Sequence, residues 1–193
     1  DINNSIERYY QRHYINIDRN EFDKWLETII PSSVTVMNRC IYRSYEEQVD
    51  GIIVRLNYDG KEYEEKAKIL VGADGAFANM LAPKLYVTIQ EWFTASDSEK
   101  QNYYGAIFDK EITDFYSWTI PKEDKIILGS ALNLGDDLHR RFELLKKKLL
   151  DYGYRFDKVL QRNGAYMYRP VKRSQICTGG NRIALVGEAA GLI

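Results

Sequence analysis

Two short segments of the sequence carry residue types that could hold a large polar ligand. In each, an apolar run leads into a glycine, an acidic residue and further small residues: Gly72-Ala73-Asp74-Gly75-Ala76 and Gly187-Glu188-Ala189-Ala190-Gly191. Glycine allows close backbone approach, and a strand that opens into a helix through small residues directs free N–H groups at one spot. A pyrophosphate or a row of hydroxyl groups would suit that spot. Any α/β protein can reverse its chain with the same pattern, so this alternative stays open.

Other reactive residue types are sparse and isolated. His13 and His139 stand alone, and Cys40 and Cys177 have neither CxxC spacing nor a basic cluster around them. The sequence therefore predicts no metal site, no disulfide framework and no thiol catalysis. With 27 Lys and Arg against 28 Asp and Glu, the formal charge of −1 gives no reason to expect nucleic acid as a partner. No apolar run approaches the length of a membrane span, so no integral membrane segment is expected.

The first third of the chain is predicted to contain one clear helix. Apolar residues at helical spacing cover residues 20–30, with Asn20 as the N-cap and Pro31 ending the run. A weaker helical stripe covers residues 2–10, and residues 14–17 have the pattern of a short strand.

A second amphipathic helix is predicted from Asp136, its N-cap, to Gly153. Its apolar face is formed by Leu138, Phe142, Leu145 and Leu149. The opposite face is basic and is interpreted as a solvated surface, with an anion or lipid surface as the alternative.

Alternating patterns predict an antiparallel meander followed by a larger antiparallel sheet. The meander runs from Val34 to Gly72, with Asp59-Gly60 as a tight hairpin. Its expected strands are 34–36, 52–58, 63 onward and 67–71, and those of the larger sheet are 85–93, 103–108, 115–120 and 125–131. A last buried strand, 182–186, leads into the second acidic turn. The predicted fold class is therefore α+β.

Taken together, these segments resemble a known family. The two acidic turns are similar, in order and separation, to the GADG and GDAAG segments of FAD-dependent reductases and hydroxylases. Residues 17–26 resemble the R-x-x-F-D-x-x-L entry to the helix that follows the FAD-binding segment. Residues 116–122, with Gly129 after them, resemble the Y-x-W-x-F-P-K…G stretch of the geranylgeranyl reductase-like branch. The resemblance extends from Tyr14 to Gly191.

The sequence departs from the family pattern at three points. Glu188 stands where the family usually has Asp, Ile120 replaces a Phe, and the sequence contains no GxGxxG. We therefore expect an internal fragment of an FAD/NAD(P)-binding-type flavoprotein, which by itself binds FAD poorly. Residues 1–82 and 171–193 would be parts of the FAD-binding domain without its GxGxxG unit, and residues 83–170 would form an antiparallel-sheet substrate domain.

The resemblance implies FAD as the cofactor, with NAD(P)H as a candidate electron donor. It implies flavin-mediated hydride transfer to a double bond of an isoprenoid-like or other small apolar substrate. A flavin-dependent aromatic monooxygenase and a non-catalytic ligand-binding or interaction domain are the alternatives. A cytoplasmic location is expected, and peripheral contact with a membrane stays open.

The resemblance also implies the site residues, although it identifies no catalytic residue. The implied cofactor-binding residues are Arg19, Gly72, Asp74, Gly75, Gly187, Glu188, Ala189, Ala190 and Gly191. The substrate cavity is expected to be bordered by Tyr116, Trp118 and Pro121. Arg19 could instead pair with an acidic neighbour, and packing alone could explain the two aromatic residues. Because both acidic turns should serve one cofactor, they are expected to lie close together.

Overall fold

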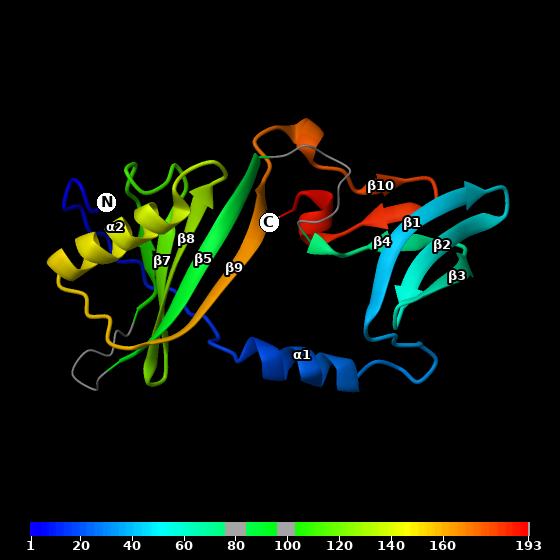
Figure 1. Cartoon of the computed structure of the whole chain (residues 1–193), viewed down its shortest axis with the longest axis horizontal. Coiled ribbons are helices and arrows are strands. Elements are labelled where there is room, and N and C mark those ends of the chain that lie inside the picture. Colours follow the sequence, from blue (N-terminus) through cyan, green and yellow to red (C-terminus); the bar gives the residue numbers. More distant parts are fainter. Residues whose placement is uncertain (76–83, 96–102, 193) are drawn as a thin grey trace.

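The computed structural model describes residues 1–75, 84–95 and 103–192, and within them it contains two α-helices and three β-sheets (Figure 1). The predicted α+β class is confirmed. The predicted domain boundary at residues 82 and 83 lies outside the described residues, as do Ala76 of the first turn and Ile193. Figure 1 shows the largest sheet with α2 at one end of the molecule and the β1–β3 sheet at the other.

The β1–β3 sheet is the predicted meander with a shifted start. Its strands β1 (Cys40–Gln48), β2 (Gly51–Tyr58) and β3 (Lys61–Ala67) pair antiparallel in chain order. The Asp59-Gly60 hairpin is confirmed, because both residues have positive φ, 48° and 83°. The predicted strand at 34–36 is wrong, because those residues are not in a strand and β1 begins at Cys40. β1 was not predicted because most of its side chains are exposed, so apolar alternation is weak.

The predicted strand at 67–71 is divided between two sheets. β3 ends at Ala67, and β4 (Leu70–Gly72) begins a small sheet with β10 (Gly179–Gly180) and β11 (Ile183–Leu185). The predicted strand 182–186 corresponds to β11. The break at residues 68 and 69 lets one continuous apolar pattern serve two sheets.

The largest sheet is antiparallel, as predicted for residues 85–131. It consists of β5 (Lys84–Thr94), β6 (Gly105–Ile107), β7 (Ser117–Lys122), β8 (Lys125–Asn133) and β9 (Val159–Arg169), in the order β6-β7-β8-β5-β9. Of the predicted strand 103–108, only Gly105–Ile107 form a strand, β6. The edge strand β9 was not predicted, because most of its side chains are exposed and no apolar face marks it.

Helix α2 (Leu138–Asp151) covers one face of this sheet (Figure 1). Phe142, Leu145 and Leu149 are fully buried and pack in one core with sheet residues that include Phe93 and Leu128. Burial of each of these side chains stabilises the fold by about 1.5–3 kcal/mol. The N-cap is Asp137, which accepts a hydrogen bond from the Arg140 N–H at 3.0 Å, so the predicted cap at Asp136 is wrong. Asp136 instead pairs with Arg141 at 3.2 Å.

Helix α1 (Arg19–Thr28) is confirmed, but its cap is not Asn20. Asp18 is the N-cap, two residues before the predicted cap, and its Oδ1 accepts from the N–H groups of Asn20 at 2.9 Å and Glu21 at 3.1 Å. The chain before it, residues 14–17, is not a strand. No residue of α1 is buried.

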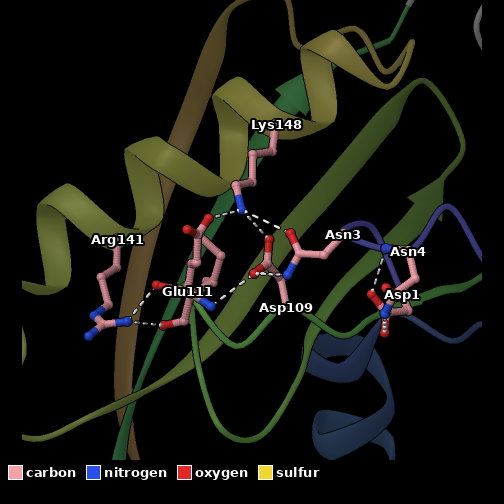
Figure 2. Close-up of polar contacts among 8 residues, drawn as sticks. Asp1, Asn3, Asn4, Asp109, Glu111, Arg141 and Lys148 are labelled. Carbon is pink, nitrogen blue, oxygen red and sulfur yellow. Dashed lines mark hydrogen bonds and ion pairs between the residues drawn. The ribbon is translucent and has the colours of Figure 1, made fainter.

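The predicted helical stripe at residues 2–10 is also wrong, and a turn at residues 2–5 stands in its place. Figure 2 shows how this turn is held: Asn3 Nδ2 donates to Asp109 Oδ1 at 2.9 Å, and Lys148 Nζ donates to Asp109 Oδ2 at 2.7 Å and to Asn3 Oδ1 at 3.2 Å. Ile2 packs against the α2 core. Tertiary contacts therefore override the local pattern.

The Asp109 carboxylate is nearly inaccessible to solvent, with 5% of the residue exposed. Burial alone would raise its pKa, but hydrogen bonds from Lys148 and Asn3 outweigh this effect, and the pKa lies below its ordinary value. Burial alone would likewise lower the pKa of Lys148, but Asp109 and Glu111 hold it above its ordinary value. Both groups are therefore charged at neutral pH, and they fix the N-terminal turn to α2.

Candidate functional site

The small sheet brings the two acidic turns together. β4 and β11 are parallel neighbours, with Val71 opposite Ala184 and Gly72 opposite Leu185. The pairing continues where the Val186 N–H donates to the Gly72 carbonyl at 3.0 Å. Because parallel strands end at the same edge of a sheet, both turns leave from one place. The prediction that the turns lie close together is confirmed.

Glycine residues lie where the two turns approach each other. A Cβ at Gly72 would lie 2.8 Å from Leu185 Cδ2, so any larger residue there requires the leucine tip to shift. Gly75 has φ of +71°, and a Cβ there would lie 4.0 Å from Glu188 Oε2. Position 75 thus needs glycine for its left-handed backbone and faces the acidic residue of the other turn.

The two acidic side chains have different surroundings. Asp74 is exposed, whereas Glu188 is half-buried in the short 3₁₀ helix η4 (Gly187–Ala190). Glu188 Oε1 accepts a hydrogen bond from the backbone N–H of Tyr168 in β9 at 2.6 Å. The last three residues of the second turn, Ala189, Ala190 and Gly191, are buried, and the Ala190 carbonyl accepts from Cys177 N–H at 3.0 Å. Gly187 remains exposed beside them.

Two tyrosines near these carboxylates were missed by the sequence analysis. Burial raises the pKa of Tyr168, and the charges of Glu188 and Asp74 add to the effect. Burial also raises the pKa of Tyr42, with contributions from Tyr45 and Asp74. Neither tyrosine carried a usable sequence signal, because they belong to β1 and β9, strands that the sequence did not predict.

Arg19 is placed differently from the turns. It lies on α1 and forms an exposed ion pair with Asp23 at 3.6 Å. This is the alternative interpretation of Arg19, pairing with an acidic neighbour, and its predicted contact with a cofactor stays a prediction.

Tyr116 and Trp118 belong to a group of aromatic side chains near the end of β6 and the start of β7. The rings of Tyr116 and Trp118 are 5.8 Å apart, and Tyr116 also contacts Phe115 at 4.6 Å and Phe108 at 6.2 Å. The Trp118 indole lies over Gly129, where a Cβ would come within 2.2 Å of the ring, and its Nε1 donates to Gln90 Oε1 at 3.4 Å. We call Phe108, Phe115, Tyr116 and Trp118 the aromatic group.

Pro121 lies further along β7, in the part of the strand that extends beyond the short neighbour β6. A proline tolerates this position because no ladder hydrogen bond is required there. Its carbonyl accepts a hydrogen bond from Asn16 Nδ2 at 2.8 Å, and Lys122 Nζ donates to the Ile17 carbonyl at 2.5 Å. These contacts hold the segment before α1 against the end of β7.

The end of β9 connects the turns to the aromatic group. Tyr168 donates its N–H to Glu188, and the next residue, Arg169, places its guanidinium 4.8 Å from the ring centre of Phe115. Arg169 NH1 also donates to the hydroxyl of the fully buried Tyr86 at 3.0 Å. The predicted cofactor site and the predicted substrate site are therefore joined through two consecutive residues.

The fold defines a class: the chain has the α+β fold of flavoproteins. It aligns with a geranylgeranyl bacteriochlorophyll reductase-like protein from Thermoplasma acidophilum at a TM-score of 0.72 and 19% identity, covering 91% of this chain and 48% of that protein. The TM-score is 0.67 for a flavoprotein/dehydrogenase from Cytophaga hutchinsonii, at 15% identity, and the alignment covers 90% of this chain and 47% of that protein. The TM-score is 0.60 for p-nitrophenol 4-monooxygenase from Pseudomonas putida, at 12% identity, and the alignment covers 89% of this chain and 46% of that protein.

At the sequence level, the chain is similar to Protein CbrA of Escherichia coli O9:H4 (strain HS). The two are 37% identical over the whole of this chain, which spans 54% of the length of that protein. No family model matches the chain.

Two further properties bear on the site. None of the described helices is long and apolar enough to cross a membrane. Nor do residues 1–75, 84–95 and 103–192 contain a group of three or more side chains that could hold a metal ion.

Proposed function

We propose that this chain is the part of an FAD-dependent oxidoreductase that contributes two cofactor-facing turns and the substrate sheet. The observation that supports this function most strongly is the parallel pairing of β4 with β11, which aligns Gly72 with Leu185. The two acidic glycine turns are separated by more than a hundred residues in the sequence, and this pairing brings them to one edge, where they could contact one ligand. The fold likeness to flavoproteins supports the same conclusion.

The residues of the turns fit the polar part of FAD. Asp74 is exposed and can accept hydrogen bonds from hydroxyl groups, and Gly187 has open space where a Cβ would stand. Backbone N–H groups of the glycine turns suit phosphate oxygens. The carboxylate of Glu188 borders the same place. When bound, FAD would supply the hydride chemistry, and these residues would hold and orient it.

The aromatic group and Pro121 would border the substrate. The neighbouring rings of Tyr116 and Trp118 suit contact with an apolar molecule, which supports an isoprenoid-like or similarly apolar substrate. In this proposal the substrate receives hydride at a double bond. In this proposal, residues 83–170 form the substrate domain, and residues 1–82 and 171–193 belong to the FAD-binding domain. NAD(P)H is proposed as the electron donor.

Oxygenation of an aromatic ring is the second candidate reaction, and the likeness to p-nitrophenol 4-monooxygenase favours it. Stopped-flow spectra separate the two reactions: a monooxygenase, once reduced and mixed with oxygen, forms an oxygenated flavin before product. A reductase passes its electrons to the substrate without oxygen.

A pair of matched substitutions tests the cofactor site in the full-length protein. Asp74→Asn removes the exposed charge of the first turn, and Asp59→Asn makes the same change in the Asp59-Gly60 hairpin of the β1–β3 sheet. Loss of a charged hydrogen bond is worth about 1.5–3 kcal/mol, so Asp74→Asn should weaken FAD binding about 10- to 100-fold in a fluorescence titration. Asp59→Asn should bind like the wild type. A wild-type protein that binds no FAD, or equal binding by both variants, would contradict the proposal.

A further inference from the structure

The acidic residue of the second turn is bonded to the substrate sheet. β9 is an edge strand of the five-stranded sheet, and the outward N–H groups of an edge strand lack a partner strand. The Tyr168 N–H donates to Glu188 Oε1 at 2.6 Å, a short bond typical of a charged acceptor. One edge group of the sheet is thus satisfied by a side chain of the small β10-β11-β4 sheet region.

The same carboxylate reaches the first turn. Glu188 Oε2 lies 4.0 Å from the position that a Cβ would occupy at Gly75, which is empty because glycine has no side chain. A single side chain therefore borders both acidic turns and holds β9 at the same time.

The contact with β9 continues to the aromatic group. Arg169 follows Tyr168, lies 4.8 Å from the ring centre of Phe115, and donates to the Tyr86 hydroxyl. Phe115 in turn contacts Tyr116 at 4.6 Å. A displacement of Tyr168 would thus move the guanidinium that is stacked on the aromatic group.

We propose that Glu188 is a positioning residue, whose side-chain length ties β9 to the two turns and so sets the place of the aromatic group relative to a bound flavin. The inference rests on the proposed function where it concerns the flavin, but the contact itself does not. An aspartate at this position would be shorter by one C–C bond, about 1.5 Å, and its oxygen would fall outside hydrogen-bonding range of the Tyr168 N–H.

Three variants separate length from charge in the full-length protein. Glu188→Asp keeps the charge and shortens the side chain, whereas Glu188→Gln keeps the length and removes the charge. Glu62→Asp makes the length change at an exposed position on β3 and serves as the matched control. The first measurement is amide hydrogen exchange, without added cofactor, in the peptide that contains Tyr168. The second is visible circular dichroism of bound FAD, which reports the surroundings of the flavin ring.

The expected results differ between the variants. Glu188→Asp should speed exchange at Tyr168 about tenfold or more, the effect of one lost charge-assisted hydrogen bond, and should change the flavin signal. Glu188→Gln should retain slow exchange at Tyr168, because its carboxamide oxygen still reaches the N–H. Glu62→Asp should change neither measurement.

Arg169→Gln extends the test if Glu188→Asp does not fold. It leaves the bond between Glu188 and Tyr168 intact and removes the stacked guanidinium, so the flavin signal should change while exchange at Tyr168 stays slow. The proposal would be overturned if Glu188→Asp exchanged at Tyr168 as slowly as the wild type, or if Glu188→Asp and Glu188→Gln had the same exchange rate at Tyr168. An unchanged flavin signal in Arg169→Gln would also overturn it. If the wild type binds no FAD, the proposed function fails, and the exchange measurements still decide whether Glu188 holds β9.

Discussion

Gly72 lies directly against Leu185, and a Cβ at position 72 would stand 2.8 Å from Leu185 Cδ2. The parallel pairing of β4 and β11, the strands that lead into the two acidic turns, therefore depends on the absence of a side chain at position 72. Because the leucine tip can shift, an alanine should be tolerated better than a β-branched residue.

We expect Gly72→Val to lower the free energy of unfolding by about 1–3 kcal/mol and to weaken FAD binding, since it separates β4 from β11. Gly180→Val is the matched control, because Gly180 belongs to β10 of the same sheet and has open space around the position of a Cβ. Urea unfolding with FAD titration checks both effects. Equal losses in the two variants would show that the contact with Leu185 is unimportant.

The buried Asp109 should contribute more to stability than the exposed Glu111, although both pair with Lys148. The Asp109 side chain is 1% exposed, and the Glu111 side chain is 66% exposed. We expect Asp109→Asn to cost about 3 kcal/mol and Glu111→Gln less than about 1 kcal/mol, because solvent screens the second pair. Thermal unfolding measures both, and similar melting temperatures for the two variants would contradict the account.

The Asp109 carboxylate also predicts a dependence of stability on pH. Its pKa in the folded chain lies below the ordinary value, so its stabilising contribution is fully present above that ordinary value, about 3.9. The contribution is lost as the pH falls towards the folded pKa, because the folded state resists protonation. The difference in unfolding free energy between wild type and Asp109→Asn should therefore be constant from pH 5 to 7, and should shrink below about pH 4. A difference that stays constant in acid would refute this prediction.

Gly129 should be required by the indole of Trp118. A Cβ at position 129 would come within 2.2 Å of Trp118 Cε2 and within 2.4 Å of two further ring atoms, so the whole indole would have to move. We expect Gly129→Ala to destabilise the protein by about 1–3 kcal/mol. In the Trp118→Ala background the same change should cost less than about 0.5 kcal/mol, because the clash is gone. Additive effects in this double-mutant cycle would show that the ring does not depend on Gly129.

The sequence predicted the elements whose pattern matches their burial. Phe142, Leu145 and Leu149 recur at helical spacing and are all buried, so α2 was predicted within two residues at either end. The Asp59-Gly60 hairpin was predictable because only residues that tolerate positive φ fit it. The closeness of the two turns was predicted on the assumption of one shared ligand. In the structure, the parallel pairing of β4 and β11 brings the turns together.

The parts that were not predicted depend on tertiary contacts. β9 is mostly exposed and is recognised as a strand only through its pairing with β5, as in the register of Tyr168 with Leu85. The turn near Asn3 is fixed by Asp109 and Lys148, more than a hundred residues away. Since Tyr168 lies on β9, its bond to Glu188 could not be read from the sequence either.

The most direct test of the central claim is photochemical labelling of the full-length protein with an azide-bearing FAD, followed by mapping of the labelled peptides. If both turns face one flavin cofactor, label should appear in residues 70–75 and in residues 183–192, and unmodified FAD should suppress both signals at the same concentration. Label in only one of these segments, or in neither, would contradict the claim that the paired turns form one FAD site.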